Sequence, residues 1–117
     1  MPGFELIGNK ELNNIKEIFK KSNGVLFAHG FDKLRKNIFR VRKFENEISK
    51  FFGSKYVQCV SSGTAAIKIA LKSAGVKYND EVITQGFNFI ATIEAIVDCG
   101  AKPVITGIND DLNLDLK

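Results

Sequence analysis

The segment between residues 56 and 106 most constrains the fold, because strand-like and helix-like stretches alternate along it. Three short runs, YVQCV, EVIT and KPVIT, contain the β-branched and aromatic residues that favour strands. Between them, TAAIKIALKSAG and residues 88–98 carry apolar residues at helical spacing, and a glycine closes each stretch. Strands that alternate with helices form a sheet covered by helices, so the pattern predicts an α/β fold with about three strands.

Two amphipathic helices are predicted before this region. The first begins after Asn9, a residue suited to capping a helix, and stops at Gly24. The second has the sequence RVRKFENEISKFF, with its apolar residues on one stripe and Gly53 as its cap. Residues 25–37 lack a clean periodicity, which predicts a loop or an irregular turn.

The chain of 117 residues is long enough for one compact core. We expect a helical segment over residues 1–53 and the first part of an α/β domain over residues 54–117. A sheet of about three strands is smaller than the usual five or six and leaves an open edge. We therefore expect the chain to be a truncated part of a longer protein or one product of a split gene.

The composition is that of a globular protein in water, with 44% hydrophobic and 26% charged residues. No run approaches the roughly 20 apolar residues of a membrane helix, and the N-terminus is too polar for a signal peptide, so we expect a cytoplasmic protein. Cys59 and Cys99 are isolated among apolar residues, which predicts buried reduced thiols and no metal site. His29 is predicted to lie in a loop without a catalytic partner.

A basic stretch between Lys33 and Lys43 accounts for much of the net charge of +4. Apolar and aromatic residues interrupt it, and such interleaving can contact nucleic acid or phosphorylated ligands. The apolar spacing also fits a helix with solvated charges on its outer face. We favour the solvated face, and a nucleic-acid-binding regulator is the minor alternative.

The turn Ser61-Ser62-Gly63-Thr64 connects the first predicted strand directly to a helix. The free N–H groups of the first helical turn would point into the crevice at the strand's carboxyl end, where they can bind an anion. Gly63 lets a phosphate approach the backbone, Thr64 adds a hydroxyl, and the small Ala65 leaves the approach open. The alternative is a plain serine N-cap that binds no ligand. No G-x-G-x-x-G motif follows a strand, which disfavours a dinucleotide-binding dehydrogenase.

The order of motifs from VSSGTAAIKIAL through DEVITQGFNFIAT to AIVDCGAKPVITGI resembles the N-terminal third of the DegT/DnrJ/EryC1/StrS aminotransferase family. The likeness reaches back to FENEISKFFGSKY and FELIGNKEL. Members of this family are fold-type-I pyridoxal-phosphate enzymes that mostly aminate keto sugars attached to nucleotides. The resemblance therefore implies the N-terminal portion of the large domain of that fold, with pyridoxal 5'-phosphate as its cofactor.

The resemblance also assigns roles to residues of this chain. Gly63, Thr64 and Ala65 would hold the cofactor phosphate. Phe89, the second aromatic residue of FNFIAT, would stack on the pyridine ring. Without the resemblance, Phe89 would be interpreted as a core aromatic residue at the start of a helix.

The lysine that binds the cofactor and the acid that protonates its ring nitrogen lie beyond Lys117 in the family. No catalytic residue is therefore assigned within the chain. Lys68 and Lys72 are predicted to lie on the solvated face of their helix. The complete protein is expected to be an aminotransferase, and this chain alone is expected to be inactive.

The implied reaction transfers an amino group from an amino acid to a keto sugar nucleotide, in polysaccharide or cell-surface sugar biosynthesis. The resemblance also implies a homodimer for the complete protein. The alternative from a different functional class is a non-catalytic regulatory module that binds a phosphate ligand or a nucleotide at the same turn.

Overall fold

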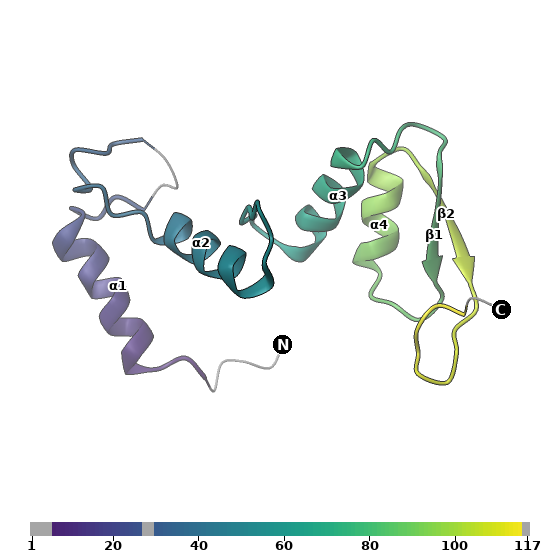
Figure 1. Cartoon of the computed structure of the whole chain (residues 1–117), viewed down its shortest axis with the longest axis horizontal. Helices are drawn as coiled ribbons and strands as arrows, with labels where there is room; N and C mark the ends of the chain where they lie inside the picture. The colour runs from purple at the N-terminus through teal and green to yellow at the C-terminus, as the bar shows by residue number, and fades with distance from the viewer. Residues whose placement is uncertain (1–5, 27–29, 116–117) are drawn as a thin grey trace. The chain divides into compact units, whose positions relative to one another are not determined.

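The computed structural model describes residues 6–26 and 30–115 (Figure 1). The chain divides into two compact units, an N-terminal unit of residues 1–59 and a C-terminal unit of residues 60–117, and each is considered by itself. Among the described residues, no helix is both long enough and apolar enough to cross a membrane. The elements in chain order are α1 (Asn9–Lys21), α2 (Arg40–Phe52), α3 (Gly63–Ser73), β1 (Glu81–Gln85), α4 (Ala91–Asp98) and β2 (Lys102–Thr106).

Helix α1 starts one residue earlier than predicted, because Gly8 and not Asn9 is its N-cap. The carboxylate of Glu11 accepts a hydrogen bond of 2.8 Å from the N–H of Gly8 and so closes the first turn. This hydrogen bond lowers the pKa of Glu11 below its ordinary value. A glutamate at the third helical position thus does the capping that we had expected from an asparagine side chain.

Helix α2 has the predicted length and the predicted C-cap. Gly53 adopts the left-handed conformation with φ of 66°, and its N–H donates to the carbonyl of Ser49. The described residues before α2, from 30 to 39, form turns without a helix or strand, which confirms an irregular connection. At the N-terminus of α2, Phe39 provides no side-chain cap.

The basic stretch is solvated only in part, because Lys33, Lys36, Arg42 and Lys43 are exposed and Arg35 is buried. Arg35 is 5% exposed, and its guanidinium lies 4.4 Å from the centroid of the Phe39 ring. Arg42 contacts the same ring at 4.2 Å. Arg40 pairs with Glu17 of α1 at 3.3 Å. All three arginines of the stretch therefore make contacts within the N-terminal unit.

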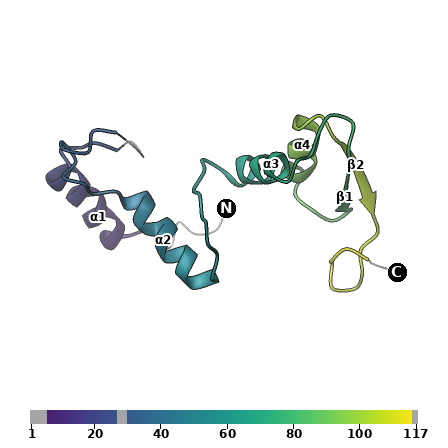
Figure 2. The same ribbon diagram turned by 45° about the horizontal axis from the view of Figure 1, so that its top comes forward.

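The C-terminal unit is built on two parallel strands. In the register of β1 and β2, Glu81 is opposite Lys102 and Gln85 is opposite Thr106. Helix α4 connects the strands and packs against β2, and α3 packs against α4 (Figures 1 and 2). The core consists of small and branched apolar side chains, namely Ala91, Ala95, Ile96, Cys99 and Ala101.

The prediction of a strand at YVQCV is wrong, because these residues form no strand in the structure. The described sheet has two strands, where about three were expected. The N–H of Cys59 donates to Glu45 Oε1 at 2.8 Å, and the side-chain amide of Gln58 donates to the same atom at 3.3 Å. A β-strand requires a neighbouring strand whose backbone hydrogen-bonds to it. Here the carboxylate of Glu45 in α2 accepts the hydrogen bond from the N–H of Cys59 instead. The high β-propensity of these residues was therefore not sufficient.

Helix α4 begins at Ala91, three residues later than the predicted start at residue 88. The side-chain amide of Asn88 turns back onto the end of β1, where it donates to Thr84 Oγ1 at 3.2 Å and to the carbonyl of Gln85. This local bond holds residues 86–90 in a turn. At the other end of α4, Gly100 has a φ of +79°, and a Cβ there would lie 3.0 Å from the ring of Tyr78.

Candidate functional site

Two backbone N–H groups are available at the start of α3. Ser62 is the N-cap, and its hydroxyl accepts the N–H of Ala65 at 3.1 Å. The carbonyl of Ser62 accepts the N–H of Ala66 at 3.0 Å. Within the described part of the chain, the N–H groups of Gly63 and Thr64 have no acceptor. Unused N–H groups at the positive end of a helix dipole attract an anion.

The space in front of these N–H groups is open. No heavy atom lies within 4 Å of the position that a Cβ of Gly63 would take. Gly63 is exposed, and Thr64 and Ala65 are half-buried. The three residues predicted to hold a phosphate therefore form one turn. Gly63 and Thr64 offer free N–H groups, whereas the N–H of Ala65 is used by the Ser62 cap.

Phe89 lies in the turn that leads from β1 into α4. Its side chain is 74% exposed, so it does not fill the core of the C-terminal unit. Its carbonyl accepts the N–H of Thr92 at 3.0 Å, which ties the residue to the first turn of α4. The ring is thus held on a defined backbone and has a free face.

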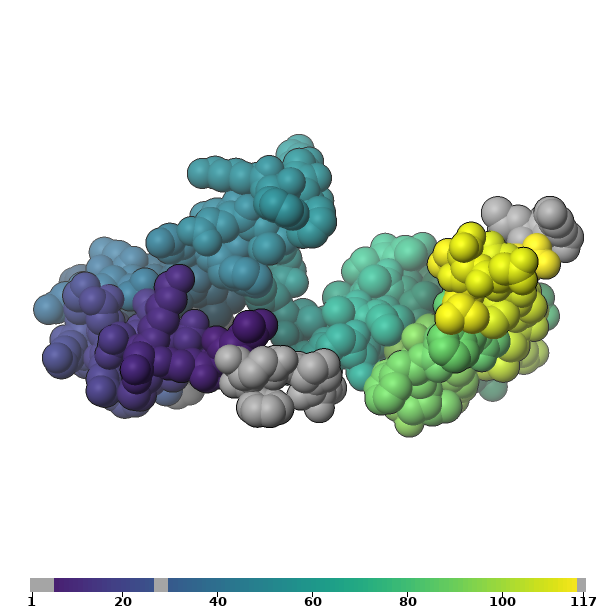
Figure 3. Space-filling view, turned by 90° about the horizontal axis from the view of Figure 1, so that it is seen from below, coloured from purple at the N-terminus to yellow at the C-terminus, as the bar shows by residue number. Residues whose placement is uncertain are grey.

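The fold brings the two parts of the predicted site to one end of the C-terminal unit. Figure 1 shows α3 and α4 starting at the same end, where β1 and β2 also finish. Figure 3 views the chain from that end, with α3 and the segment that leads into α4 on the visible face. The turn at Gly63 and the turn at Phe89 therefore occupy the carboxyl edge of the strands, where α/β proteins bind their ligands.

Sequence reasoning missed the contribution of Asn88. Its side chain bonds both the hydroxyl of Thr84 and the carbonyl of Gln85, and it directly precedes Phe89. The signal was an asparagine four residues after the end of the predicted strand EVIT, a residue type that often stabilises turns through its own side chain.

Lys72 is exposed and the side chain of Lys68 is 43% exposed, which agrees with the predicted solvated face, and each amine also has a partner. Lys68 Nζ lies 2.9 Å from Asp98 Oδ2, and Lys72 Nζ donates to the carbonyl of Cys99 at 2.8 Å. The hydrogen bond with Asp98 raises the pKa of Lys68 above its ordinary value. Both amines are therefore directed to the carboxyl end of α4.

The remaining candidate residues belong to different surroundings. Cys99 is 3% exposed, which confirms a buried thiol, whereas Cys59 is half-buried in the N-terminal unit. Both thiols are free. His29 falls outside the described residues. Among the residues described, no group of three or more histidine, cysteine, aspartate or glutamate residues could hold a metal ion.

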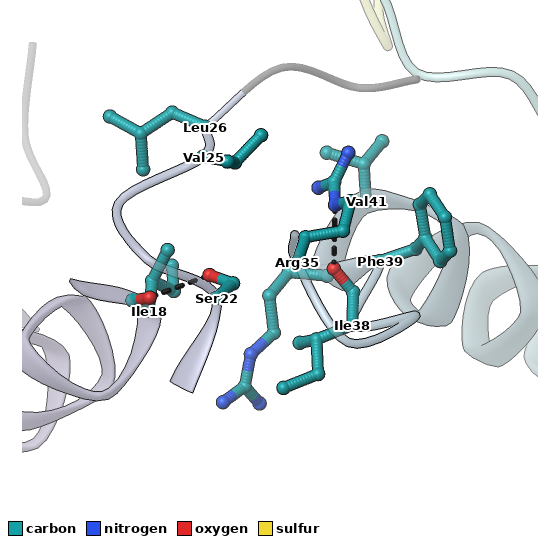
Figure 4. Close-up of a pocket in the computed structure, with 9 residues that line it drawn as sticks. Ile18, Ser22, Val25, Leu26, Arg35, Ile38, Phe39 and Val41 are labelled. Atoms are coloured by element: carbon teal, nitrogen blue, oxygen red, sulfur yellow. Dashed lines mark hydrogen bonds between the residues drawn. The ribbon is translucent and has the colours of Figure 1, made fainter. Parts of the chain in front are cut away.

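The N-terminal unit contains a small pocket of about 130 Å³ (Figure 4). It lies between the end of α1 and the start of α2, and its walls are mainly apolar. The guanidinium of Arg35 donates to the carbonyl of Ile38 at 3.0 Å, and the hydroxyl of Ser22 donates to the carbonyl of Ile18. None of the residues predicted to bind a cofactor lines this pocket.

Comparison with protein families shows a match along most of the chain. The model of the DegT/DnrJ/EryC1/StrS aminotransferase family matches residues 17–117. Among curated proteins, the chain is similar to the spore coat polysaccharide biosynthesis protein SpsC of Bacillus subtilis strain 168, with 42% identity over 77 residues. This match covers 65% of this chain and 20% of SpsC. It is also 37% identical over 71 residues to GDP-perosamine synthase of Vibrio cholerae, which covers 61% of this chain and 19% of that enzyme.

Solved structures of related proteins also match the chain over most of its length. An aminotransferase from Psychrobacter cryohalolentis superimposes with a TM-score of 0.73 and 29% identity, covering 92% of this chain and 24% of that one. NtdA from Bacillus subtilis, solved with bound cofactor PMP, gives a TM-score of 0.72 and 31% identity, covering 91% of this chain and 23% of NtdA. The chain therefore spans about a fifth of the length of the curated relatives it matches.

Proposed function

Since the chain belongs to the DegT/DnrJ/EryC1/StrS aminotransferase family, we propose that it forms the first part of a pyridoxal-phosphate-dependent sugar aminotransferase. The predicted fold class, the N-terminal portion of the fold-type-I large domain, is confirmed by the solved relatives. The complete protein would transfer an amino group from an amino acid to a keto sugar attached to a nucleotide. Similarity to GDP-perosamine synthase and to a spore coat polysaccharide biosynthesis protein supports this substrate class.

The observation that carries the proposal is the pair of free N–H groups at Gly63 and Thr64 beside an open space. These donors fit the phosphate of pyridoxal phosphate, because they lie at a helix N-terminus and no side chain obstructs their approach. When bound, pyridoxal phosphate supplies an aldehyde that takes up the amino group and a pyridine ring that withdraws electrons from the bond being broken. A solved relative, NtdA, carries the amino form of this cofactor.

The residues of this chain would bind and orient the cofactor. The N–H groups of Gly63 and Thr64 would donate to phosphate oxygens, and the hydroxyl of Thr64 would add a third donor. The methyl group of Ala65 is small enough to leave the turn accessible. The exposed ring of Phe89 would lie against the pyridine ring and restrain its orientation.

The catalytic lysine is proposed to lie outside residues 1–117. The two lysines of α3 that are nearest in sequence to the phosphate turn, Lys68 and Lys72, bind the carboxyl end of α4. Neither amine is directed to the start of α3, so neither is placed to react with a ligand held there. The isolated chain is therefore proposed to lack transaminase activity, and assembly of the complete protein as a homodimer is part of the same proposal.

The assignment of the phosphate turn can be tested in the complete protein by titration with pyridoxal phosphate. A variant with Gly63→Val and Thr64→Val places two side chains in the approach and removes a hydroxyl. We expect its dissociation constant to rise at least about tenfold, a loss of roughly 1.4 kcal/mol. Ser73→Val, at the other end of α3, is the matched control and should leave the affinity unchanged. Equal affinity of the double variant and the wild-type protein would refute the assignment.

A further inference from the structure

Two lysines of α3 reach across to the end of α4. Lys68 is bonded to Asp98, the last residue of α4, at 2.9 Å. One turn further along α3, Lys72 donates to the carbonyl of Cys99, the C-cap of α4, at 2.8 Å. Cationic groups at the carboxyl end of a helix interact favourably with its exposed carbonyls and its dipole. These two bonds therefore connect α3 to the carboxyl end of α4, which is opposite the candidate site.

The end of α4 that receives these lysines is firmly packed. Cys99 is 3% exposed, and its thiol lies 3.7 Å from the carbonyl of Lys68. Ala95 and Ile96 of α4 are also buried, at 0% and 1% exposure. The two lysine bonds add directional contacts to this packing, each of them to one atom at the end of α4.

We propose that Lys68 and Lys72 are positioning residues that fix the axial register of α3 against α4, and thereby the distance between the phosphate turn and Phe89. This inference rests on the proposed function. The two helices run in the same direction, with the Gly63 turn at the start of one and Phe89 two residues before the start of the other. A slip of one residue would move the turn by about 1.5 Å relative to Phe89.

Such a displacement is large for a binding site. Ligand-binding groups must be held to within about 0.5 Å of their working positions. A ligand that contacts both turns, such as pyridoxal phosphate, depends on their separation. Inorganic phosphate contacts the α3 turn alone and does not depend on it. The two ligands therefore distinguish a loss of register from a general loss of structure.

The test uses the complete protein with Lys68→Ala and Lys72→Ala combined, and measures the affinities for pyridoxal phosphate and for inorganic phosphate. We expect the dissociation constant for pyridoxal phosphate to rise about tenfold and that for inorganic phosphate to change less than about twofold. The Lys68→Arg and Lys72→Arg double variant should restore the wild-type ratio, because arginine also donates to a carboxylate and a carbonyl. Lys77→Ala removes an exposed lysine after α3, is the control for the loss of a surface positive charge, and should change neither affinity.

A more conservative variant tests the same bond with less risk of misfolding. Asp98→Asn keeps the size of the side chain and weakens its bond to Lys68, so it should raise the dissociation constant for pyridoxal phosphate about two- to threefold without affecting inorganic phosphate. The proposal is overturned if both variants bind pyridoxal phosphate like the wild-type protein, or if they lose both ligands equally. If the wild-type protein binds pyridoxal phosphate independently of Gly63 and Thr64, the proposed function fails, and this inference fails with it.

Discussion

Replacing Phe89 by alanine is expected to weaken the binding of pyridoxal phosphate to the complete protein by about two- to twelvefold. The estimate follows from the contact that the ring would make. An aromatic pair contributes about 0.5 to 1.5 kcal/mol beyond its buried area, and 1.4 kcal/mol corresponds to a tenfold change in affinity. Phe89 is 74% exposed in the present structure, so its removal takes little packing from the C-terminal unit.

Two further substitutions separate stacking from burial. Phe89→Leu retains apolar volume without an aromatic face, so we expect it to lose nearly as much affinity as Phe89→Ala. Phe89→Tyr retains the ring and should bind within about twofold of the wild-type protein. Phe87 is a matched control two residues earlier, because it is also exposed, at 59%, and lies in the same turn.

The assay is a titration of each apoprotein with pyridoxal phosphate, followed by absorbance. The compared variants should have the same thermal stability. Phe87→Ala should change the dissociation constant by less than about twofold. Equal losses for Phe87→Ala and Phe89→Ala would show that the turn as a whole matters and that Phe89 has no specific stacking role. An unchanged affinity for Phe89→Ala would refute the assignment directly.

Two predictions concern the stability of the units themselves. Ile96 is 1% exposed, so Ile96→Ala should lower the free energy of unfolding by about 2–5 kcal/mol in a urea titration, and a loss below about 1 kcal/mol would contradict its place in the core. The pKa of Glu11 is lowered because its carboxylate accepts a hydrogen bond from the N–H of Gly8. The contribution of this cap to the stability of the folded chain is therefore present above the ordinary pKa of 4.5, and it is lost as the pH falls through the lowered pKa. The amide proton resonance of Gly8 should report that titration in the wild-type chain and stay flat in Glu11→Gln, whereas a flat wild-type profile would show that the capping bond is not populated.

Most elements of the fold could be predicted from local sequence. The two N-terminal helices, α3, β1 and β2 agree with the predicted spacing, because a helical stripe and a capping glycine act within a few residues of each other. The glycine at position 53 adopts the left-handed conformation that its place after α2 indicated. An anion site at the turn of Gly63 stays a prediction: the structure agrees with its serine cap and with the helix that follows, but not with a strand before it.

The errors concern features that depend on residues distant in sequence. The run YVQCV has the propensity of a strand, yet the carboxylate of Glu45 binds its backbone, and no neighbouring strand among the described residues completes a ladder. The ion pair of Lys68 with Asp98, which is 30 residues away, was likewise not predictable from the pattern of α3 alone.

The sequence alone therefore encodes which segments become helices, and it predicts a phosphate site at the turn of Gly63. Periodicity, caps and glycines act over one or two turns, so they are encoded locally. Only the tertiary structure decided that the turns at Gly63 and Phe89 share one edge of the unit, and that two lysines tie α3 to the far end of α4. These arrangements depend on how the helices pack, and the sequence pattern of either helix alone carries no information about its partner.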